Sequence, residues 1–140
     1  MGTRGVIQVV TTFPAKRSVF LTQQFDGDQL AAVLAHALQR SRAVWAYPDA
    51  LATAVFGQML LEYGGGPAER NIDNLRSLGI STEFEGSDVP VLVVDPNRRL
   101  VIRRDPRNRR DEQEWLFEQY VVHFPSFKPR GLLARIFDGW

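Results

Sequence analysis

Cysteine is absent from this sequence of 140 residues, and histidine occurs only twice. The lack of cysteine excludes disulfide bonds and zinc sites built from thiolates. His36 and His123 stand 87 positions apart in the chain, so they form no metal-ligand motif. We therefore expect the protein to bind no metal ion and no cofactor.

Long apolar stretches are also missing. No segment approaches the roughly 20 apolar residues that a membrane span requires. The opening "MGTRGVIQVV" lacks the basic start and the long apolar core of a secretion signal. Together with the lack of cysteine, these absences predict a cytoplasmic protein that does not associate with a membrane.

The composition is typical of a folded domain, with 44% hydrophobic and 24% charged residues. A chain of 140 residues can bury a hydrophobic core without disulfide bonds. No linker or low-complexity segment interrupts it. We therefore expect one domain that spans residues 1–140.

Five runs rich in β-branched and aromatic residues predict strands. The first two, residues 5–13 and 17–25, are separated by the turn "PAK" and predict a hairpin. Three later runs, residues 80–85, 89–94 and 99–104, predict a three-stranded meander. The segment "DPN" favours a tight turn before the last of these strands.

Apolar residues at helical spacing predict a helix over residues 29–40, with Asp28 as its N-cap. A second predicted helix, residues 50–63, follows Asp49 and ends before three consecutive glycines. Both helices carry an apolar stripe that can cover one face of a sheet.

Three further helices are expected along the rest of the chain. Residues 67–78 predict a short one, and residues 111–123 predict one whose acidic start suits the helix dipole. Residues 128–140 predict an amphipathic C-terminal helix. Its apolar stripe either folds onto the sheet or forms the interface with a partner or a second copy; the residues are Leu133, Ile136, Phe137 and Trp140.

This order of elements predicts an α+β fold. Short connections favour a mostly antiparallel sheet, made of the N-terminal hairpin and the later three-stranded meander. The helices are expected to be packed on one face of that sheet.

The most unusual feature is a run of seven arginines within residues 98–110, accompanied by one acid, Asp105. This run carries a charge of +6, although the net charge of the chain is only +1. The arginines are Arg98, Arg99, Arg103, Arg104, Arg107, Arg109 and Arg110. Acids flank the run on both sides, so the sequence predicts a surface with segregated charge.

Three interpretations of these arginines stay open. In a strand over residues 99–104, Arg99 and Arg103 would share the solvent face with Val101, and the acids that follow could neutralise them. Alternatively, arginine forks could bind the phosphates of a nucleic acid. No aromatic residue lies between Arg98 and Arg110 to stack on bases, which disfavours single-strand binding. The third interpretation is contact with an acidic protein partner.

The sequence contains no catalytic signature. Asp26 and Asp28 could support acid–base chemistry, but "DGD" between a strand and a helix is also what a turn and a cap require. An enzyme would need a site assembled from dispersed residues such as Asp26, Asp28 and Glu62. His36 lies off the apolar stripe of its helix and is expected on the surface.

Two short motifs carry a resemblance. The start "MGTRG" and the segment "QFDG", residues 24–27, resemble a set of small proteins of phages, plasmids and bacterial mobile elements. Those proteins begin M-G-T-R followed by Ser or Gly, and carry an H-W-D-G motif at the end of the second strand. The resemblance implies a phage or mobile-element accessory protein and no particular reaction. Gln24 replaces the histidine of the motif, which removes the group that could transfer a proton.

We therefore expect a binding protein and not an enzyme. The expected partner is a host protein or nucleoprotein complex, as for an inhibitor of a bacterial defence system such as CRISPR. The seven arginines are the expected contact surface. Direct nucleic-acid binding by the same arginines is the first alternative, and a small enzyme is the second.

Overall fold

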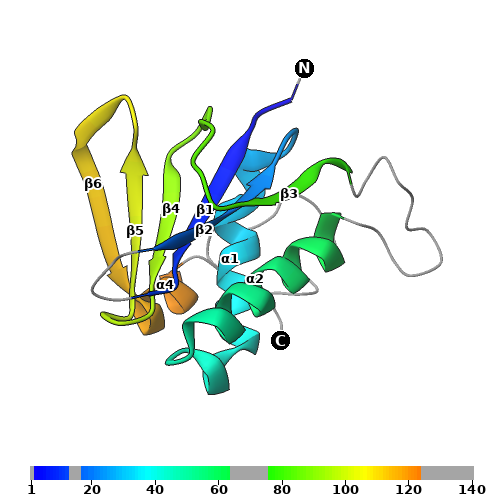
Figure 1. Cartoon of the computed structure of the whole chain (residues 1–140). Coiled ribbons are helices and arrows are strands. Elements are labelled where there is room, and N and C mark those ends of the chain that lie inside the picture. The colour runs from blue at the N-terminus through cyan, green and yellow to red at the C-terminus, as the bar shows by residue number, and fades with distance from the viewer. Residues whose placement is uncertain (1, 13–16, 64–75, 124–140) are drawn as a thin grey trace.

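Six strands form one mixed sheet in the computed structural model, which describes residues 2–12, 17–63 and 76–123 (Figure 1). They are β1 (Gly5–Val10), β2 (Ser18–Gln23), β3 (Leu78–Ser81), β4 (Val91–Asp95), β5 (Leu100–Asp105) and β6 (Asn108–Leu116). Their order is β3-β2-β1-β4-β5-β6, with β1 and β4 parallel and all other neighbours antiparallel. The prediction of a mostly antiparallel sheet is confirmed.

The helices of the described residues cover one face of this sheet, as Figure 1 shows. They are α1 (Leu30–Arg40), α2 (Pro48–Tyr63) and α4 (Phe117–His123), with short 3₁₀ turns at Gly27–Gln29 and Arg42–Val44. The hydroxyl of Tyr120 in α4 donates a hydrogen bond to the carbonyl of Ala31 in α1 at 2.7 Å. The predicted α+β fold is therefore confirmed.

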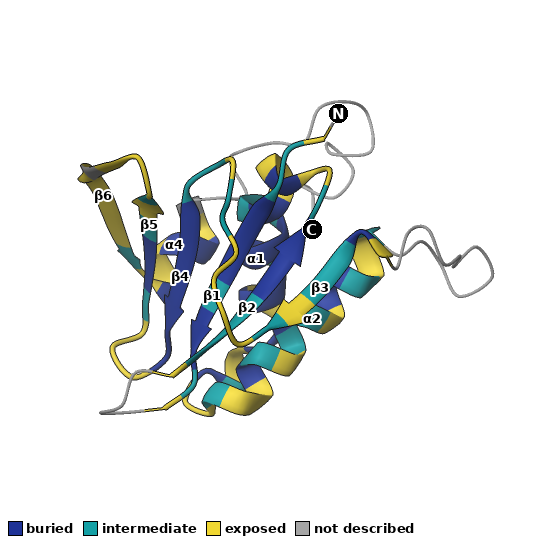
Figure 2. Ribbon diagram, turned by 45° about the horizontal axis from the view of Figure 1, so that its top comes forward, coloured by how far each residue is buried: buried dark blue, intermediate teal, exposed yellow. Residues whose placement is uncertain are grey.

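The central strands are buried on both faces (Figure 2). In β1, Ile7 and Val9 face the helices and belong to the main core, while Val6 and Val10 belong to a second cluster on the opposite face. Burial on both sides explains why β1 has a nearly continuous apolar run instead of strict alternation.

The predicted helix over residues 111–123 is wrong in its first half. β6 continues to Leu116, and α4 begins at Phe117. β6 is the last strand of the sheet, and its residues from Arg110 to Glu114 are all exposed. Because neither face is buried there, the sequence lacks the period-2 pattern that identifies a strand.

The partner of β3 also differs from the predicted meander. β3 pairs with β2, with Ile80 opposite Leu21, and the three consecutive antiparallel strands are β4, β5 and β6. β1 occupies the place beside β4 that the meander would have given to β3. The loop from β3 to β4 is held near the start of β1, where the N–H of Asp88 donates to the carbonyl of Arg4 at 2.8 Å.

The predicted N-cap role of Asp28 is wrong. Asp28 lies inside the 3₁₀ turn that precedes α1, and the residue at the cap position is Gln29, whose backbone is already helical. No side chain donates or accepts a capping hydrogen bond at this helix start. The 3₁₀ turn therefore does what a polar cap was expected to do.

Several predictions concern residues that the structure does not describe. Most of the helix predicted over residues 67–78 lies outside the described residues. So does the whole amphipathic helix predicted over residues 128–140, with Leu133, Ile136, Phe137 and Trp140. Among the helices within residues 2–12, 17–63 and 76–123, none has the length and apolar content needed to cross a membrane.

The chain crosses itself closely at the start of β1. The N–H of Thr3 donates to the carbonyl of Phe25, and the N–H of Gly27 donates to the carbonyl of Thr3, both at 2.7 Å. A Cβ atom on Gly5 would lie 2.6 Å from the Cα of Gly27, so this approach requires glycine. We call this contact between residues 3–5 and 25–27 the N-terminal crossing. It brings together parts of the two motifs, "MGTRG" and "QFDG".

Replacing Gly27 with alanine tests this close approach. The added methyl group would meet the backbone of Arg4 and Gly5, so we expect Gly27→Ala to lower the free energy of unfolding by about 3 kcal/mol or more. Gly57 lies on the exposed side of α2 and has nothing within 4 Å of its Cβ position. Gly57→Ala should raise the free energy of unfolding by roughly 0.5–1 kcal/mol. Urea unfolding measures both, and equal effects of the two substitutions would contradict the crossing.

Candidate functional site

β5 and β6 meet in a turn shaped by side-chain hydrogen bonds. Asp105 pairs with Asn108, and the Oδ1 atom of Asp105 accepts the N–H of Arg107 at 2.9 Å. The Oδ1 atom of Asn108 accepts the N–H of Arg110 at 3.2 Å. Short Asp and Asn side chains provide such bonds to nearby backbone groups, which is why "DPRN" forms a turn. We call residues 103–110 the hairpin tip.

The seven arginines divide into two groups. Arg98 and Arg99 lie in the turn before β5, and the other five lie in the hairpin tip at its far end. A strand rises about 3.3 Å per residue, so the length of β5 separates the two groups by roughly 15 Å. The sequence predicts Arg99 as the first residue of this strand, but the strand begins at Leu100. Arg99 lies in the turn, where its φ of 55° is in the left-handed region.

The first group is neutralised by nearby acids. Asp95 is buried and accepts two hydrogen bonds from Arg98, one from the backbone N–H at 3.2 Å and one from Nε at 2.9 Å. The hydrogen bond that Arg98 donates to Asp95 raises the pKa of Arg98. Arg99 lies 4.0 Å from a carboxylate oxygen of Glu118. The interpretation of arginines that pair with nearby acids holds for this turn.

The hairpin tip differs because part of its charge is unpaired. Arg104 forms an ion pair with Glu112 at 3.2 Å. Within the described part of the chain, the guanidinium groups of Arg103, Arg107 and Arg110 form no hydrogen bond or ion pair. The side chain of Arg109 lies outside what the structure describes. The tip therefore presents three guanidinium groups that no carboxylate of the described residues pairs with.

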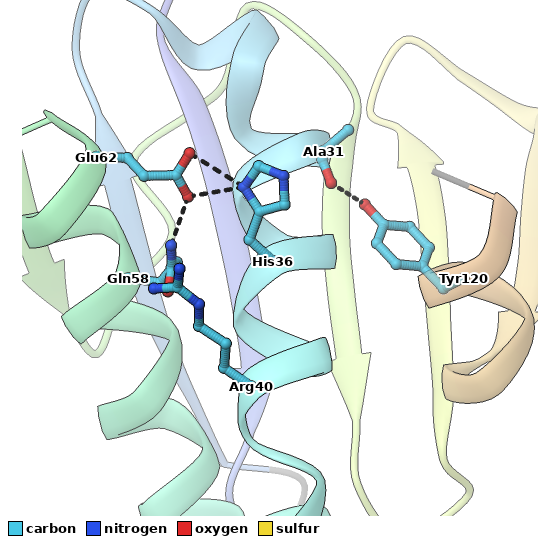
Figure 3. A network of polar contacts seen from close by, with 6 residues as sticks. All are labelled: Ala31, His36, Arg40, Gln58, Glu62 and Tyr120. Carbon is cyan, nitrogen blue, oxygen red and sulfur yellow. Dashed lines mark hydrogen bonds and ion pairs between the residues drawn. The ribbon is translucent and has the colours of Figure 1, made fainter. Parts of the chain in front are cut away.

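A second polar cluster joins α1 to α2, as Figure 3 shows. The Nδ1 atom of His36 lies 3.1 Å from each carboxylate oxygen of Glu62. Gln58 donates from Nε2 to Oε2 of Glu62 at 2.8 Å, and Arg40 donates to the amide oxygen of Gln58 at 3.4 Å. We call these four residues the helix clasp. The sequence places His36 on the surface, but its side chain is only 38% exposed.

The clasp can bind and release a proton. The hydrogen bond to Glu62 raises the pKa of His36, burial opposes this effect, and Arg40 also lowers the pKa. A carboxylate that holds Nδ1 leaves Nε2 as the other titratable atom of the ring. No hydroxyl group of the described residues bonds to His36. Among the described residues, the cluster is therefore a hydrogen bond between two helices, and it becomes an ion pair when His36 is protonated.

Tyr63 connects the clasp region to the N-terminal crossing. Its hydroxyl donates a hydrogen bond to the carbonyl of Asp26 at 3.1 Å. Burial raises the pKa of Tyr63, and the charges of Glu62, Asp26 and Asp28 raise it further. These three carboxylates are the ones that the sequence analysis names for a possible enzyme site, and all three lie close enough to Tyr63 to affect its pKa. Among residues 2–12, 17–63 and 76–123, no three His, Asp or Glu side chains are placed to share a metal ion.

Sequence reasoning did not find Arg40, Gln58 and Tyr63. Gln58 and Glu62 stand four positions apart on α2, as His36 and Arg40 do on α1, and these two spacings are the local signals in this cluster. His36 and Glu62 are 26 positions apart on different helices, so only the packing of α1 against α2 brings them together.

Comparison of the chain with protein-family models, with curated proteins and with solved structures found no match. The resemblance of "MGTRG" and "QFDG" to proteins of phages and mobile elements stays a prediction.

The two Asp-Pro turns around β5 provide a test of the distinction between paired and unpaired arginines. We expect Asp95→Ala to lower the free energy of unfolding by about 2 kcal/mol, because a buried carboxylate with two donors is lost. Asp105→Ala should cost less than about 1 kcal/mol, because only one exposed turn hydrogen bond is lost. Thermal or urea unfolding compares them, and a larger cost for Asp105→Ala would be inconsistent with this geometry.

Proposed function

We propose that the protein acts by binding, and that the hairpin tip holds an anionic surface of a macromolecular partner. The observation that carries this proposal is that Arg103, Arg107 and Arg110 form no ion pair with any residue of the described part of the chain. Arg98 and Arg99, in contrast, are already engaged by acids of the same chain.

The chemistry of arginine supports an anionic partner. Its planar guanidinium donates two parallel hydrogen bonds to a carboxylate or a phosphate. Arg107 and Arg110 are exposed at the end of a hairpin on an edge of the sheet, so a partner can reach them without rearranging the fold. An arginine without an internal ion pair loses no existing interaction when the partner binds.

The proposed partner is a host protein or a nucleoprotein complex with an acidic face. This class follows from the resemblance to accessory proteins of phages and mobile elements, for which an inhibitor of a bacterial defence system is one example. The near-neutral net charge of +1 supports a local contact over general attraction to nucleic acid.

A matched pair of charge reversals tests the proposal. We expect Arg103→Glu combined with Arg107→Glu to abolish recovery of the partner when the tagged protein is pulled down from a bacterial host lysate. Arg17→Glu combined with Arg76→Glu changes the net charge equally at exposed arginines outside the tip, and should leave recovery unchanged. Circular dichroism verifies that both variants fold.

A nuclease arm identifies the kind of partner. A protein that survives nuclease and disappears only with the tip variant supports the proposal. Recovery that vanishes with nuclease, and that falls steeply with salt, indicates direct nucleic-acid binding instead. Equal recovery by the two folded variants would show that the tip is not the contact surface.

A further inference from the structure

The helix clasp has the parts of a proton-sensitive contact. His36 belongs to α1 and Glu62 to the last turn of α2, so their ion pair links two separate elements of the fold. Gln58 donates to one oxygen of Glu62 at 2.8 Å, a contact between two residues of α2 that does not involve His36. Figure 3 shows the carboxylate facing the imidazole from the neighbouring helix. The acceptor therefore faces the imidazole and is held by a second residue of its own helix.

The charged groups around His36 make the contact sensitive to its charge. From α2, Glu62 faces the imidazole, and from α1 itself Arg40 opposes protonation. On the α4 side of α1, the hydroxyl of Tyr120 is bound to the carbonyl of Ala31, in a separate contact (Figure 3). Protonated His36 attracts Glu62 as a charge and as a hydrogen-bond donor, while neutral His36 can only donate a hydrogen bond from Nδ1.

We propose that His36 and Glu62 form a pH-operated clasp, which holds the C-terminal half of α2 against α1 in mildly acidic solution and loosens as the pH rises. The sign follows from linkage. A group whose pKa is higher in the folded state than in the unfolded state stabilises the fold below its ordinary value of about 6.5. That stabilisation is lost as the pH rises through the higher value of the folded state.

The effect of the clasp extends to the N-terminal crossing. α2 ends at Tyr63, next to Glu62, and the hydroxyl of Tyr63 donates to the carbonyl of Asp26. A looser end of α2 therefore weakens one of the hydrogen bonds that hold residues 25–27. The clasp works independently of the proposed contact at the hairpin tip, which lies on β5 and β6.

Titration of His36 by nuclear magnetic resonance on the full chain tests the first step. We expect an imidazole pKa above the ordinary value of about 6.5. In Glu62→Gln, which keeps a hydrogen-bond acceptor but removes the charge, the pKa should fall to the ordinary value or below it. Burial and Arg40, which both lower the pKa, are then opposed only by a neutral acceptor. Glu83→Gln is the control, because it removes an exposed carboxylate of the loop after β3 and should leave the titration unchanged.

Hydrogen exchange of the backbone amides tests the second step. After correction for the intrinsic pH dependence of exchange, protection in the last two turns of α2 should fall about two- to fivefold between acidic and alkaline solution, the size expected for a partly exposed ion pair. His36→Gln and Glu62→Gln should remove this pH dependence. The same His36 titration in the parent protein and in Glu62→Gln would overturn the proposal, as would protection of α2 that does not change with pH.

Discussion

The parallel pairing of β1 with β4 is the contact on which the rest of the structure depends. It joins the N-terminal hairpin to the β4–β6 strands, with Ile7 opposite Leu92 and Val9 opposite Val94. These four side chains are buried beneath the helices, and burial of apolar surface is the main favourable term in folding. Parallel neighbours need a long connection, and here α1, α2 and β3 supply it. The same pairing therefore explains why helices cover the sheet and why β3 lies at its far edge.

The sequence predicts those helices and strands whose buried faces give a regular pattern of apolar residues. Apolar patterns in the sequence predict β1, β4, β5 and α1, because each of these elements buries at least one face. β6 does not, because residues 110–114 are exposed and their acids suit a helix start equally well. The prediction of the N-terminus of α1 is wrong for another reason, because a 3₁₀ turn stands where Asp28 was expected to act as a polar cap. The α+β class follows from composition and order, whereas the pairing of β3 with β2 depends on contacts distant in sequence.

The candidate sites depend even more on contacts between residues that are distant in sequence, which local patterns do not predict. The arginines are visible in the sequence, but their partners are not. Asp95 and Asp105 both begin Asp-Pro turns, yet only Asp95 is buried and binds the side chain of an arginine. The pair of His36 with Glu62 needs two helices to meet, and no spacing rule connects positions that far apart. Residue type therefore predicts which kind of partner a surface can bind. The fold determines which charged side chains are not already paired within the chain.

Electrostatic pairing within the chain separates the arginines of the proposed contact surface from those that support the fold. An arginine already held by a carboxylate must give up that contact before it can bind a partner, so its net contribution to affinity is small. This applies to Arg98, whereas Arg107 and Arg110 have no such carboxylate among residues 2–12, 17–63 and 76–123. The helix clasp lies between α1 and α2, while the helix that contacts β5 and β6 is α4. The proposed response to pH thus concerns the contact between two helices, whereas the proposed binding concerns the β6 edge of the sheet, so neither requires a change in the other.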